Sequence, residues 1–247
     1  MPGPAWLILP TYDEAANLEP LVAAVRRVLA EAAPAGHRIL VVDDASPDGT
    51  GAIADRLAAA HDDVEVLHRP GKLGLGQAYR AGFDRALAGG AGHVLQMDAD
   101  FSHHPEALRA LLAHSAAGAD LVLGSRYVPG GGIVGWNPLR RVVSRAGCAY
   151  ARTVLRVPVR DLTGGLKCFR AEALEAIGYA DVRAQGYAFQ VELTYRALVL
   201  GLRVAEVPIV FSDRRQGHSK MTARIALEAG WRIPALRSGF DARLPTK

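Results

Sequence analysis

The first half of the chain alternates short apolar segments with longer segments in which apolar residues recur at helical spacing. The apolar segments, expected to form β-strands, are residues 6–10, 38–44, 64–70, 93–98 and 120–127. Helices are expected at 14–33, from Thr50, from Gly74 and from "HHPE" (103–106), which would open the last helix with Pro105 near its first turn. This alternation predicts an α/β fold with a mostly parallel sheet covered by helices on both faces.

Polar residues follow several of these apolar segments directly. Three such groups are Pro10-Thr11-Tyr12, Asp43-Asp44 and Asp98-Ala99-Asp100. In open parallel sheets, ligands bind at the carboxyl ends of the strands. We therefore expect these three groups to lie at one edge of the sheet and to form a binding site.

The second half is less regular. Residues 128–138 are rich in Gly and Pro and predict a mobile loop. The further expected elements are a basic helix at 139–155, a turn at 160–170 leading into a strand, a helix at 187–202, a strand at 203–212, a basic loop at 213–220, and a helix from Thr222. The chain contains no internal repeat and no low-complexity linker, so we expect a single domain.

The 247 residues are half hydrophobic, which suffices for a sizeable core. The two cysteines give neither a disulfide framework nor a zinc spacing, so we expect a reduced, cytoplasmic setting.

We also expect no signal peptide, because the N-terminus lacks a basic region and a long apolar run. No window reaches the roughly 18 apolar residues of a membrane span. The protein is therefore expected to be soluble or to lie on a membrane.

Charge divides the chain unevenly. Residues 1–125 carry 9 Lys/Arg and 16 Asp/Glu, whereas residues 126–247 carry 20 Lys/Arg and 9 Asp/Glu. An acidic half can hold a cation, and a basic half can hold phosphates or lie against anionic lipid. We do not expect nucleic-acid binding, because the basic residues are scattered and no nucleic-acid motif occurs.

Two motifs taken alone leave their roles open. "DDASPDGT" (43–50) partly matches a calcium loop, but it follows a strand and has Asp55 where that loop needs Glu. It predicts a turn capped by its own side chains, in which Asp44 can also accept hydrogen bonds from a base or ribose. "GKLGLGQAYRAG" (71–82) is a glycine-rich turn before a helix that lacks the full phosphate-loop pattern.

The pair Asp98 and Asp100 has two interpretations of similar weight. Carboxylates after a strand often cap the next helix. They can also hold Mg²⁺ or Mn²⁺, which take one or two carboxylates plus substrate phosphates and neutralise charge on a diphosphate leaving group. We interpret the adjacent His103 and His104 as helix-start residues. Arginines at 124–127, 140–145 and 213–220 suit phosphate oxygens, although each alone is typical of a solvated face.

In combination the motifs are much more specific. The chain resembles the dolichol-phosphate mannosyltransferase branch of glycosyltransferase family 2 in "LPTYDEAANL", "VVDDASPDGT", "GKLGLGQAYRAGF", "MDADFSHHP", "GSRYVPGGG", "DLTGGLKCFR", "GYAFQVELTYRA" and "EVPIVFSDRRQGHSK". These segments span roughly residues 7–221. The resemblance implies a Rossmann-like fold of the GT-A type. It also implies one domain with a nucleotide-sugar and metal-binding half (1–125), an acceptor half (126–221) and a basic tail (222–247).

The resemblance implies which residues of the first half bind the donor. The residues implied in nucleotide-sugar binding are Pro10, Tyr12, Glu14, Val42, Asp44, Asp98, Ala99 and Asp100. Asp98 and Asp100 would hold Mg²⁺ or Mn²⁺ and the donor diphosphate, with Ser102 as a further ligand. Some relatives have glutamine at the position of Ser102. Serine is a poorer ligand, so Ser102 would act through water.

The second half is implied to bind the acceptor. Arg126, Arg140 and Ser144 would hold the acceptor phosphate. Arg214 and Lys220 would close over the donor phosphates and the acceptor and, with Asp100 and Arg126, complete the catalytic set. Arg126, Arg214 and Lys220 would also contact the nucleotide sugar. Gln190 and Glu192 would shape the pocket.

The implied reaction is an inverting transfer of mannose from GDP-mannose to dolichyl or polyprenyl phosphate. A phosphate monoester has a second pKa of about 6 and is already anionic at neutral pH, so no general base is required. Such an enzyme is expected at the cytoplasmic face of a membrane. It would reach its lipid through its basic tail with Trp231 and Phe240 or through a separate membrane protein. An ordinary packed terminal helix is the other interpretation of that tail. Two alternatives remain, a transferase for another hexose and a catalytically silent nucleotide-binding subunit.

Overall fold

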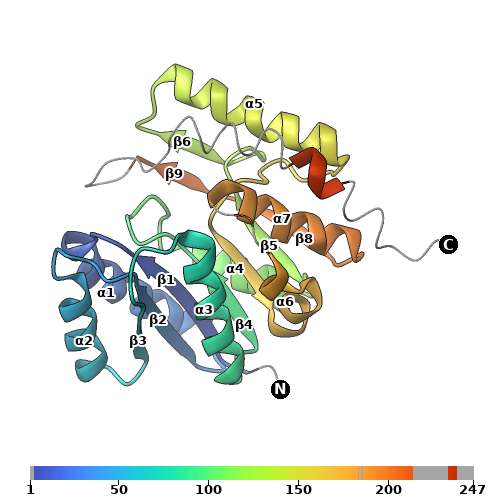
Figure 1. Cartoon of the computed structure of the whole chain (residues 1–247). Helices are drawn as coiled ribbons and strands as arrows, with labels where there is room; N and C mark the ends of the chain where they lie inside the picture. Colours follow the sequence, from blue (N-terminus) through green and yellow to red (C-terminus); the bar gives the residue numbers. More distant parts are fainter. Residues whose placement is uncertain (1–2, 183, 185, 214–232, 238–247) are drawn as a thin grey trace.

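The computed structural model describes residues 3–182, 184, 186–213 and 233–237 (Figure 1). Within them, seven strands form one sheet in the order β3-β2-β1-β4-β7-β5-β8. The bounds are β1 (Ala5–Thr11), β2 (His37–Asp43), β3 (Val64–His68), β4 (His93–Gln96), β5 (Leu121–Ser125), β7 (Lys167–Arg170) and β8 (Val204–Pro208). Only β7 runs antiparallel to its neighbours, β4 and β5, so the mostly parallel sheet is confirmed.

Helices cover both faces of the sheet, as the sequence predicts, because successive side chains of a strand point to opposite faces. Leu7 and Leu9 of β1 belong to one buried cluster, whereas Trp6 and Ile8 belong to another. The first cluster includes residues of α1 (Ala15–Ala32), α2 (Thr50–Ala60) and α4 (Ala107–Ala116). The second includes residues of α3 (Leu75–Ala88), α5 (Pro138–Leu155), α6 (Ala171–Ile177) and α7 (Gly186–Val199).

The order of the strands reverses direction at β1. From β1 the chain moves outward to β2 and β3 on one side, and β4 then pairs with the other side of β1. Such a reversal leaves a crevice at the carboxyl ends of the two central strands. Here the segments that follow β1 and β4, with Tyr12 and with Asp98 to Asp100, border that crevice.

The second half departs from the prediction in two places. The segment 128–138, expected to be a loop, contains β6 (Gly132–Val134). The single strand expected at 203–212 is divided into β8 and β9 (Val210–Ser212), and β9 pairs with β6 in a separate two-stranded sheet. The division falls at Ile209, whose N–H donates to Ser125 while its carbonyl accepts from Gly132. The backbone of the buried Ile209 thus bonds to both sheets, and the chain passes from one sheet to the other at this residue.

The short helix α6 and the 3₁₀ turn Tyr179–Asp181 were not predicted. The interpretation of His103 and His104 as helix-start residues is wrong, because α4 begins only at Ala107. Phe101 has a φ of 59°, and His103 then forms an isolated antiparallel bridge with Phe211. The His103 ring is buried edge-on against the Phe211 ring, so this segment is held in extended form against β9.

Lys167 of β7 is a fully buried cation in the second half of the sheet. Its ammonium group donates to the backbone carbonyl of Gln190 at 2.6 Å and to the hydroxyl of Thr194 at 2.8 Å, both on α7. Burial lowers the pKa of Lys167 to about 7, against the opposing charge of Asp161. The contact between β7 and α7 therefore depends on a group that titrates near neutral pH.

The folded state should bind fewer protons at Lys167 than the unfolded state does between about pH 7 and pH 10. The free energy of unfolding should therefore rise with pH in this window, by up to about 1.4 kcal/mol per pH unit from this residue alone. In Lys167→Met this contribution should vanish, as measured by urea unfolding at pH 7, 8 and 9. Lys72→Met serves as the control, because Lys72 is exposed, and its free energy of unfolding should rise with pH as in wild type. The same dependence of unfolding free energy on pH in all three proteins would refute the prediction.

Candidate active site

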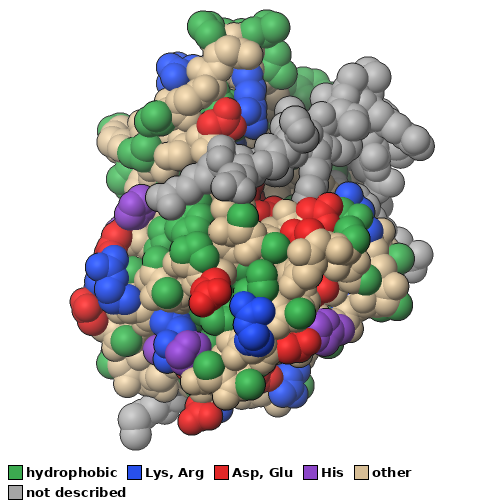
Figure 2. All heavy atoms as spheres, turned by 90° about the vertical axis from the view of Figure 1, so that its left-hand side faces the viewer, with side chains coloured by type: hydrophobic (Ala, Val, Ile, Leu, Met, Phe, Trp, Pro, Cys, Tyr) green, Lys and Arg blue, Asp and Glu red, His purple; other side chains and the backbone are tan. Residues whose placement is uncertain are grey.

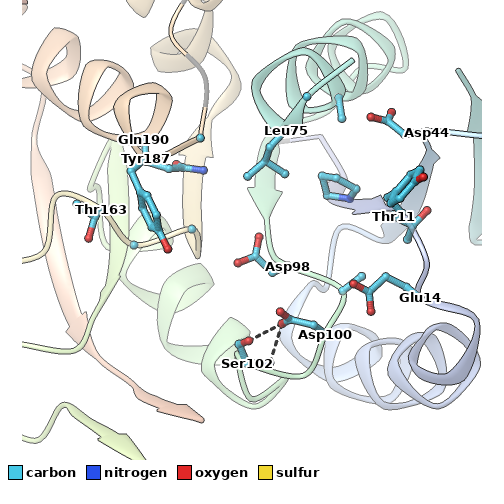
Figure 3. Close-up of a pocket in the computed structure, with 18 of the residues that line it drawn as sticks. Thr11, Glu14, Asp44, Leu75, Asp98, Asp100, Ser102, Thr163, Tyr187 and Gln190 are labelled. Atoms are coloured by element: carbon cyan, nitrogen blue, oxygen red, sulfur yellow. Dashed lines mark hydrogen bonds between the residues drawn. The ribbon is translucent and has the colours of Figure 1, made fainter. Parts of the chain in front are cut away.

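A cavity of about 590 Å³ opens at the carboxyl edge of the sheet, and both halves of the chain line it (Figure 3). The first half contributes the ends of β1, β2 and β4 and the glycine-rich turn before α3. The second half contributes the segment after β5, the start of α5, the turn before β7, the start of α7 and β9. The lining therefore joins segments that are far apart in the sequence.

Most of the residues predicted for the site lie in this cavity. Those that line it are Pro10, Tyr12, Glu14, Asp44, Asp98, Ala99, Asp100, Ser102, Arg126, Arg140 and Gln190. Arg214 and Lys220 lie outside the described residues, as do Trp231 and Phe240 of the expected tail.

Three predicted residues do not line the cavity. The Val42 side chain is fully buried in the core, because the alternation along β2 directs it toward Gly82 of α3. Ser144 is half-buried on α5 and accepts a hydrogen bond of 2.7 Å from the Tyr127 hydroxyl. Glu192 is drawn into a buried ion pair with Arg196, 2.6 Å away and one turn further along α7. The structure thus gives no side-chain contact with the cavity at these three positions.

The two aspartates after β4 differ in how they are held. Asp100 is buried, and one of its oxygens accepts hydrogen bonds from the Ser102 N–H at 3.0 Å and the Ser102 hydroxyl at 2.5 Å. Asp98 keeps 31% of its side chain exposed and lies 3.4 Å from the buried Tyr79 hydroxyl. Burial and the charge of Asp98 raise the pKa of Tyr79, so its hydroxyl stays a donor. Both carboxylates are thereby oriented along the cavity wall.

The turn before β7 comes close to Asp98. A Cβ atom added to Gly165 would lie only 3.1 Å from Asp98 Oδ2, so glycine allows this approach. His103 Nε2 lies 3.7 Å from the same oxygen. Asp98 is therefore approached by two other segments of the chain while it lines the cavity.

These carboxylates fit a divalent cation of the Mg²⁺ or Mn²⁺ type. Among the residues that the structure describes, no group of three or more His, Cys, Asp or Glu side chains could enclose a metal. A hard cation that retains waters and substrate phosphates needs only one or two carboxylates from the protein. Asp98 and Asp100 match that requirement. The two carboxylates do not match a structural metal site, in which protein side chains alone enclose the cation.

The first-half wall carries a further buried acidic group near the end of β2. Asp44 pairs with Arg69 at 2.6 Å, and both side chains are more than nine-tenths buried. Burial raises the pKa of Asp44, although Arg69 opposes the shift. The neighbouring Asp43 caps its own turn, because the N–H and hydroxyl of Ser46 donate to it. The capped turn predicted for this motif is confirmed, and Asp44 is the member that faces the cavity.

Aromatic and glycine-rich segments complete this side. The Lys72 ammonium lies 3.9 Å from the centre of the Tyr12 ring. Gly74 has a φ of 99° and precedes α3, whose first residue, Leu75, also lines the cavity. A ring, a carboxylate and a helix N-terminus on one wall suit a nucleoside with its phosphates.

Arg126 is a buried cation that the second half of the chain contributes to the cavity lining. Its guanidinium donates to both oxygens of Asp161, at 2.7 Å and 2.6 Å, and to the Thr163 hydroxyl at 2.8 Å. Burial alone would raise the pKa of Asp161, but the hydrogen bonds and charge of Arg126 lower it. The rings of Trp136 and Phe211 lie within 5.8 Å of the guanidinium. Arg126 is thus held in one orientation while it lines the cavity.

Arg140 occupies the rim. It lies on the first turn of α5, stacks 4.0 Å from the centre of the Trp136 ring and pairs with Asp213 at 3.0 Å. Asp213 remains exposed, so this pair is far more accessible to solvent and ligands than the pair of Arg126 with Asp161.

Comparison with known proteins agrees with this geometry. Residues 6–178 match the model of the family described as glycosyl transferase family 2. The chain belongs to this family. It is 48% identical over 228 residues to a polyprenol monophosphomannose synthase of Mycolicibacterium smegmatis, covering 92% of this chain and 84% of that protein. It is 45% identical over 242 residues to an undecaprenyl-phosphate mannosyltransferase of Micrococcus luteus, covering 96% of this chain and 97% of that protein.

Solved structures show the same fold. This family 2 chain superposes on glucosyl-3-phosphoglycerate synthase from Mycobacterium tuberculosis with a TM-score of 0.67 and 19% identity, over 98% of this chain and 81% of that chain. A complex of that synthase with Mn²⁺, uridine diphosphate and phosphoglyceric acid superposes with a TM-score of 0.65 and 19% identity, over 94% and 76% of the two chains. These similarities confirm the GT-A type fold predicted from the sequence.

Several residues of the family 2 site were missed from the sequence. They include Lys72, Trp136, Asp161, Thr163, Gly164, Gly165, Tyr187 and Phe211, most of which line the cavity. A signal existed for some of them, because "DLTGGLKCFR" and "GYAFQVELTYRA" are among the segments that carry the resemblance. No spacing rule connects Asp161 with Arg126, which lies 35 residues earlier in the chain.

Replacing Asp161 by Asn should leave the Arg126 guanidinium buried without its counter-charge. Breaking one side of a buried ion pair costs about 3–5 kcal/mol, measurable by urea unfolding of purified protein. Asp213→Asn is the matched control, because its pair with Arg140 is exposed and should cost less than about 1 kcal/mol. Similar losses in the two variants would show that the pair of Arg126 with Asp161 does not stabilise the fold as inferred.

Proposed function

We propose that this protein transfers mannose from GDP-mannose to dolichyl or polyprenyl phosphate and releases GDP and polyprenyl β-mannosyl phosphate. The observation that carries the proposal is the composition of the cavity. Its first-half wall presents Asp98 and Asp100, and its second-half wall presents Arg126 and Arg140. Carboxylates suit a metal-bound diphosphate donor, whereas arginines suit a phosphate acceptor. The names of the two curated relatives support mannose and a polyprenyl phosphate as the partners.

The proposed chemistry is a single displacement at the anomeric carbon of mannose. An oxygen of the acceptor phosphate forms the new bond while the bond to the donor diphosphate breaks, and GDP leaves with the electron pair. The acceptor is a phosphate monoester with a second pKa of about 6, so its oxygen is anionic at neutral pH. No protein base has to remove a proton. Attack opposite to the leaving group converts the α-linked donor into a β-linked product.

The residues of the chain would then act by orientation and by charge. Arg126, fixed by Asp161, and Arg140 at the rim would reduce the repulsion between the two anionic substrates. Asp98 and Asp100, oriented by Tyr79 and Ser102, would hold Mg²⁺ or Mn²⁺. When bound, such a cation supplies positive charge where the diphosphate departs.

The nucleoside would lie on the wall of Asp44. This carboxylate can accept hydrogen bonds from the base or ribose, and Arg69 fixes its position. Tyr12 offers its ring beside the same wall. Arg214 and Lys220 keep their proposed role of closing over the donor phosphates.

The acceptor would bring the enzyme to a membrane. None of the helices among the described residues is long and apolar enough to cross one. We propose peripheral contact at the cytoplasmic face, directly or through a separate membrane protein. Both cysteines, Cys148 and Cys168, are buried and free, which suits a reducing compartment.

A donor-by-acceptor assay tests the reaction. Purified protein should transfer label from GDP-mannose to polyprenyl phosphate with Mg²⁺ or Mn²⁺, and a chelator should abolish the transfer. Asp100→Ala should lower kcat by about a hundredfold or more, as expected for lost stabilisation of a leaving group. Transfer only from UDP-glucose would instead favour the hexosyl alternative. Nucleotide binding without any transfer would favour the silent subunit.

The acceptor site has its own test with a short, water-soluble prenyl phosphate. Arg140→Ala should raise KM for this acceptor about tenfold or more, since a hydrogen bond to a charged group is lost. KM for GDP-mannose should not change. Arg141→Ala is the matched control, because Arg141 is the exposed neighbour on the same helix and does not line the cavity. A rise in KM for the donor rather than the acceptor would contradict the assignment.

A further inference from the structure

Gln190 of α7 is a buried amide that lines the cavity, and only 2% of it is exposed. Its side-chain oxygen accepts a hydrogen bond of 2.5 Å from the side chain of Gln96. Its side-chain nitrogen has no hydrogen-bond partner within the part of the chain that the structure describes. A buried N–H group without a partner costs free energy and is rare in native proteins. The nitrogen of Gln190 is therefore a donor that a ligand in the cavity can satisfy.

The contacts of Gln96 determine which atom of Gln190 is left over. The side-chain nitrogen of Gln96 also donates to the backbone carbonyl of Gly165 at 3.0 Å. A carbonyl oxygen can only accept, so the Gln96 atom beside it has to be the nitrogen, and its second partner has to be the oxygen of Gln190. A rotated Gln190 amide would place two donors against each other. Figure 3 accordingly shows the nitrogen of Gln190 on the side that faces the cavity.

The backbone of Gln190 is fixed as firmly as its amide. The ammonium group of Lys167 donates to the Gln190 carbonyl at 2.6 Å and to the Thr194 hydroxyl at 2.8 Å. The side-chain oxygen of Gln96 also lacks a partner among the described residues, but Gln96 does not line the cavity. Gln190 is thus the member of this buried network that presents a donor to a ligand.

The turn before β7 shows where along the cavity this donor lies. At one end of the turn, the Thr163 hydroxyl accepts from Arg126 at 2.8 Å. At the other end, a Cβ atom on Gly165 would lie 3.1 Å from Asp98 Oδ2. The turn therefore spans the distance from the basic wall to the acidic wall. Gln190 shares a hydrogen-bond donor with the Gly165 carbonyl, so it lies beside the acidic end of the turn.

The acceptor phosphate belongs to the other end of this span. Arg140, which lines the cavity there, lies on the first turn of α5. Figure 2 shows Lys or Arg side chains at the top of the molecule, where Figure 1 places the start of α5. In the proposed reaction the hexose is joined to the diphosphate and attacked by the acceptor phosphate. The hexose must therefore lie between the two walls, along the turn that adjoins Gln190.

A hydroxyl group is the ligand that best fits a donor beside Asp98. It can accept a hydrogen bond from the Gln190 nitrogen and donate one to the carboxylate at the same time. An oxygen of the acceptor phosphate in that place would be repelled by the carboxylate. Among the parts of the two substrates, the hexose is the one that carries several neutral hydroxyl groups.

We propose that the side-chain nitrogen of Gln190 donates to a hydroxyl of the donor hexose and that Gln190 is thereby a specificity residue for the sugar. The proposal rests on the proposed function, because it needs a nucleotide sugar in the cavity. A site built to bond a hydroxyl discriminates against analogues that lack it, since its buried polar group is then left unpaired. The bond should contribute to binding of the hexose and not to binding of the nucleoside.

Binding without any acceptor tests the contact separately from catalysis. Gln190→Met keeps the length of the side chain and removes the donor, whereas Gln190→Glu keeps the bond with Gln96 and replaces the donor by an acceptor. By titration calorimetry with Mg²⁺, both variants should bind GDP-mannose about fivefold or more weakly than wild type. Both should bind GDP as wild type does, which also shows that they are folded. Gln77→Met is the control, because Gln77 lines the cavity from α3 and should affect GDP and GDP-mannose equally.

Donor analogues give a second readout. We would compare GDP-mannose with four GDP-deoxymannoses that lack the hydroxyl at C2, C3, C4 or C6. Gln190→Met should lower kcat/KM about fivefold or more for GDP-mannose and not for the analogue without the bonded hydroxyl. The ratio of variant to wild type cancels the intrinsic reactivity of each analogue. KM for a short, water-soluble prenyl phosphate should not change.

Three results would overturn the inference. In the first, Gln190→Met binds GDP-mannose as tightly as wild type. In the second, its kcat/KM falls by one common factor for all five donors or its KM rises for the prenyl phosphate. In the third, both Gln190 variants lose affinity for GDP, which would make the residue structural. By contrast, transfer by wild type only from UDP-glucose would remove the proposed function, and the same comparison of UDP-glucose with UDP would still test Gln190.

Discussion

The buried ion pair between Arg126 and Asp161 fixes the half of the cavity that comes from the second part of the chain. Asp161 accepts from both the guanidinium and the backbone N–H of Arg126, which attaches the turn before β7 to the end of β5. Its own backbone N–H donates to Glu206 of β8, so three segments meet at this one residue. Thr163, Gly164 and Gly165 follow directly and form the wall next to Asp98. The distance between the acidic and the basic wall therefore depends on this pair.

A similar constraint acts behind that wall. The Gln96 side chain donates to Gln190 at 2.5 Å and to the Gly165 carbonyl at 3.0 Å, and Lys167 donates to the Gln190 carbonyl. These bonds connect β4, the turn before β7 and α7 beneath the cavity. Polar groups in a buried network restrict one another, because each loses a partner if another moves. Two anionic substrates can be held against their repulsion only by walls that do not move apart.

Much of the fold follows from the sequence because its strongest signal is local. Apolar segments such as 38–44 and 93–98 alternate with helical patterns, and acidic residues after them fall at the carboxyl edge by geometry alone. The partner of Arg126 could not be found this way, since 35 residues and a helix separate it from Asp161. Ile209 looks like any strand residue, yet its backbone bonds to two different segments and divides the strand. Val42 was assigned from the resemblance, whereas the alternation along β2 turns its side chain toward α3.

The place of β7 in the sheet bears on how the chain acquires its structure. This strand, encoded well after β4 and β5, lies between them and pairs with both. During synthesis β5 has no neighbour until residues 167–170 and then 204–208 have left the ribosome. The first 125 residues therefore cannot complete the sheet on their own, and long-range pairing of this kind slows folding. Until then the edges of β4 and β5 stay open to other chains, so this enzyme depends on its late segments for solubility as well as for its site.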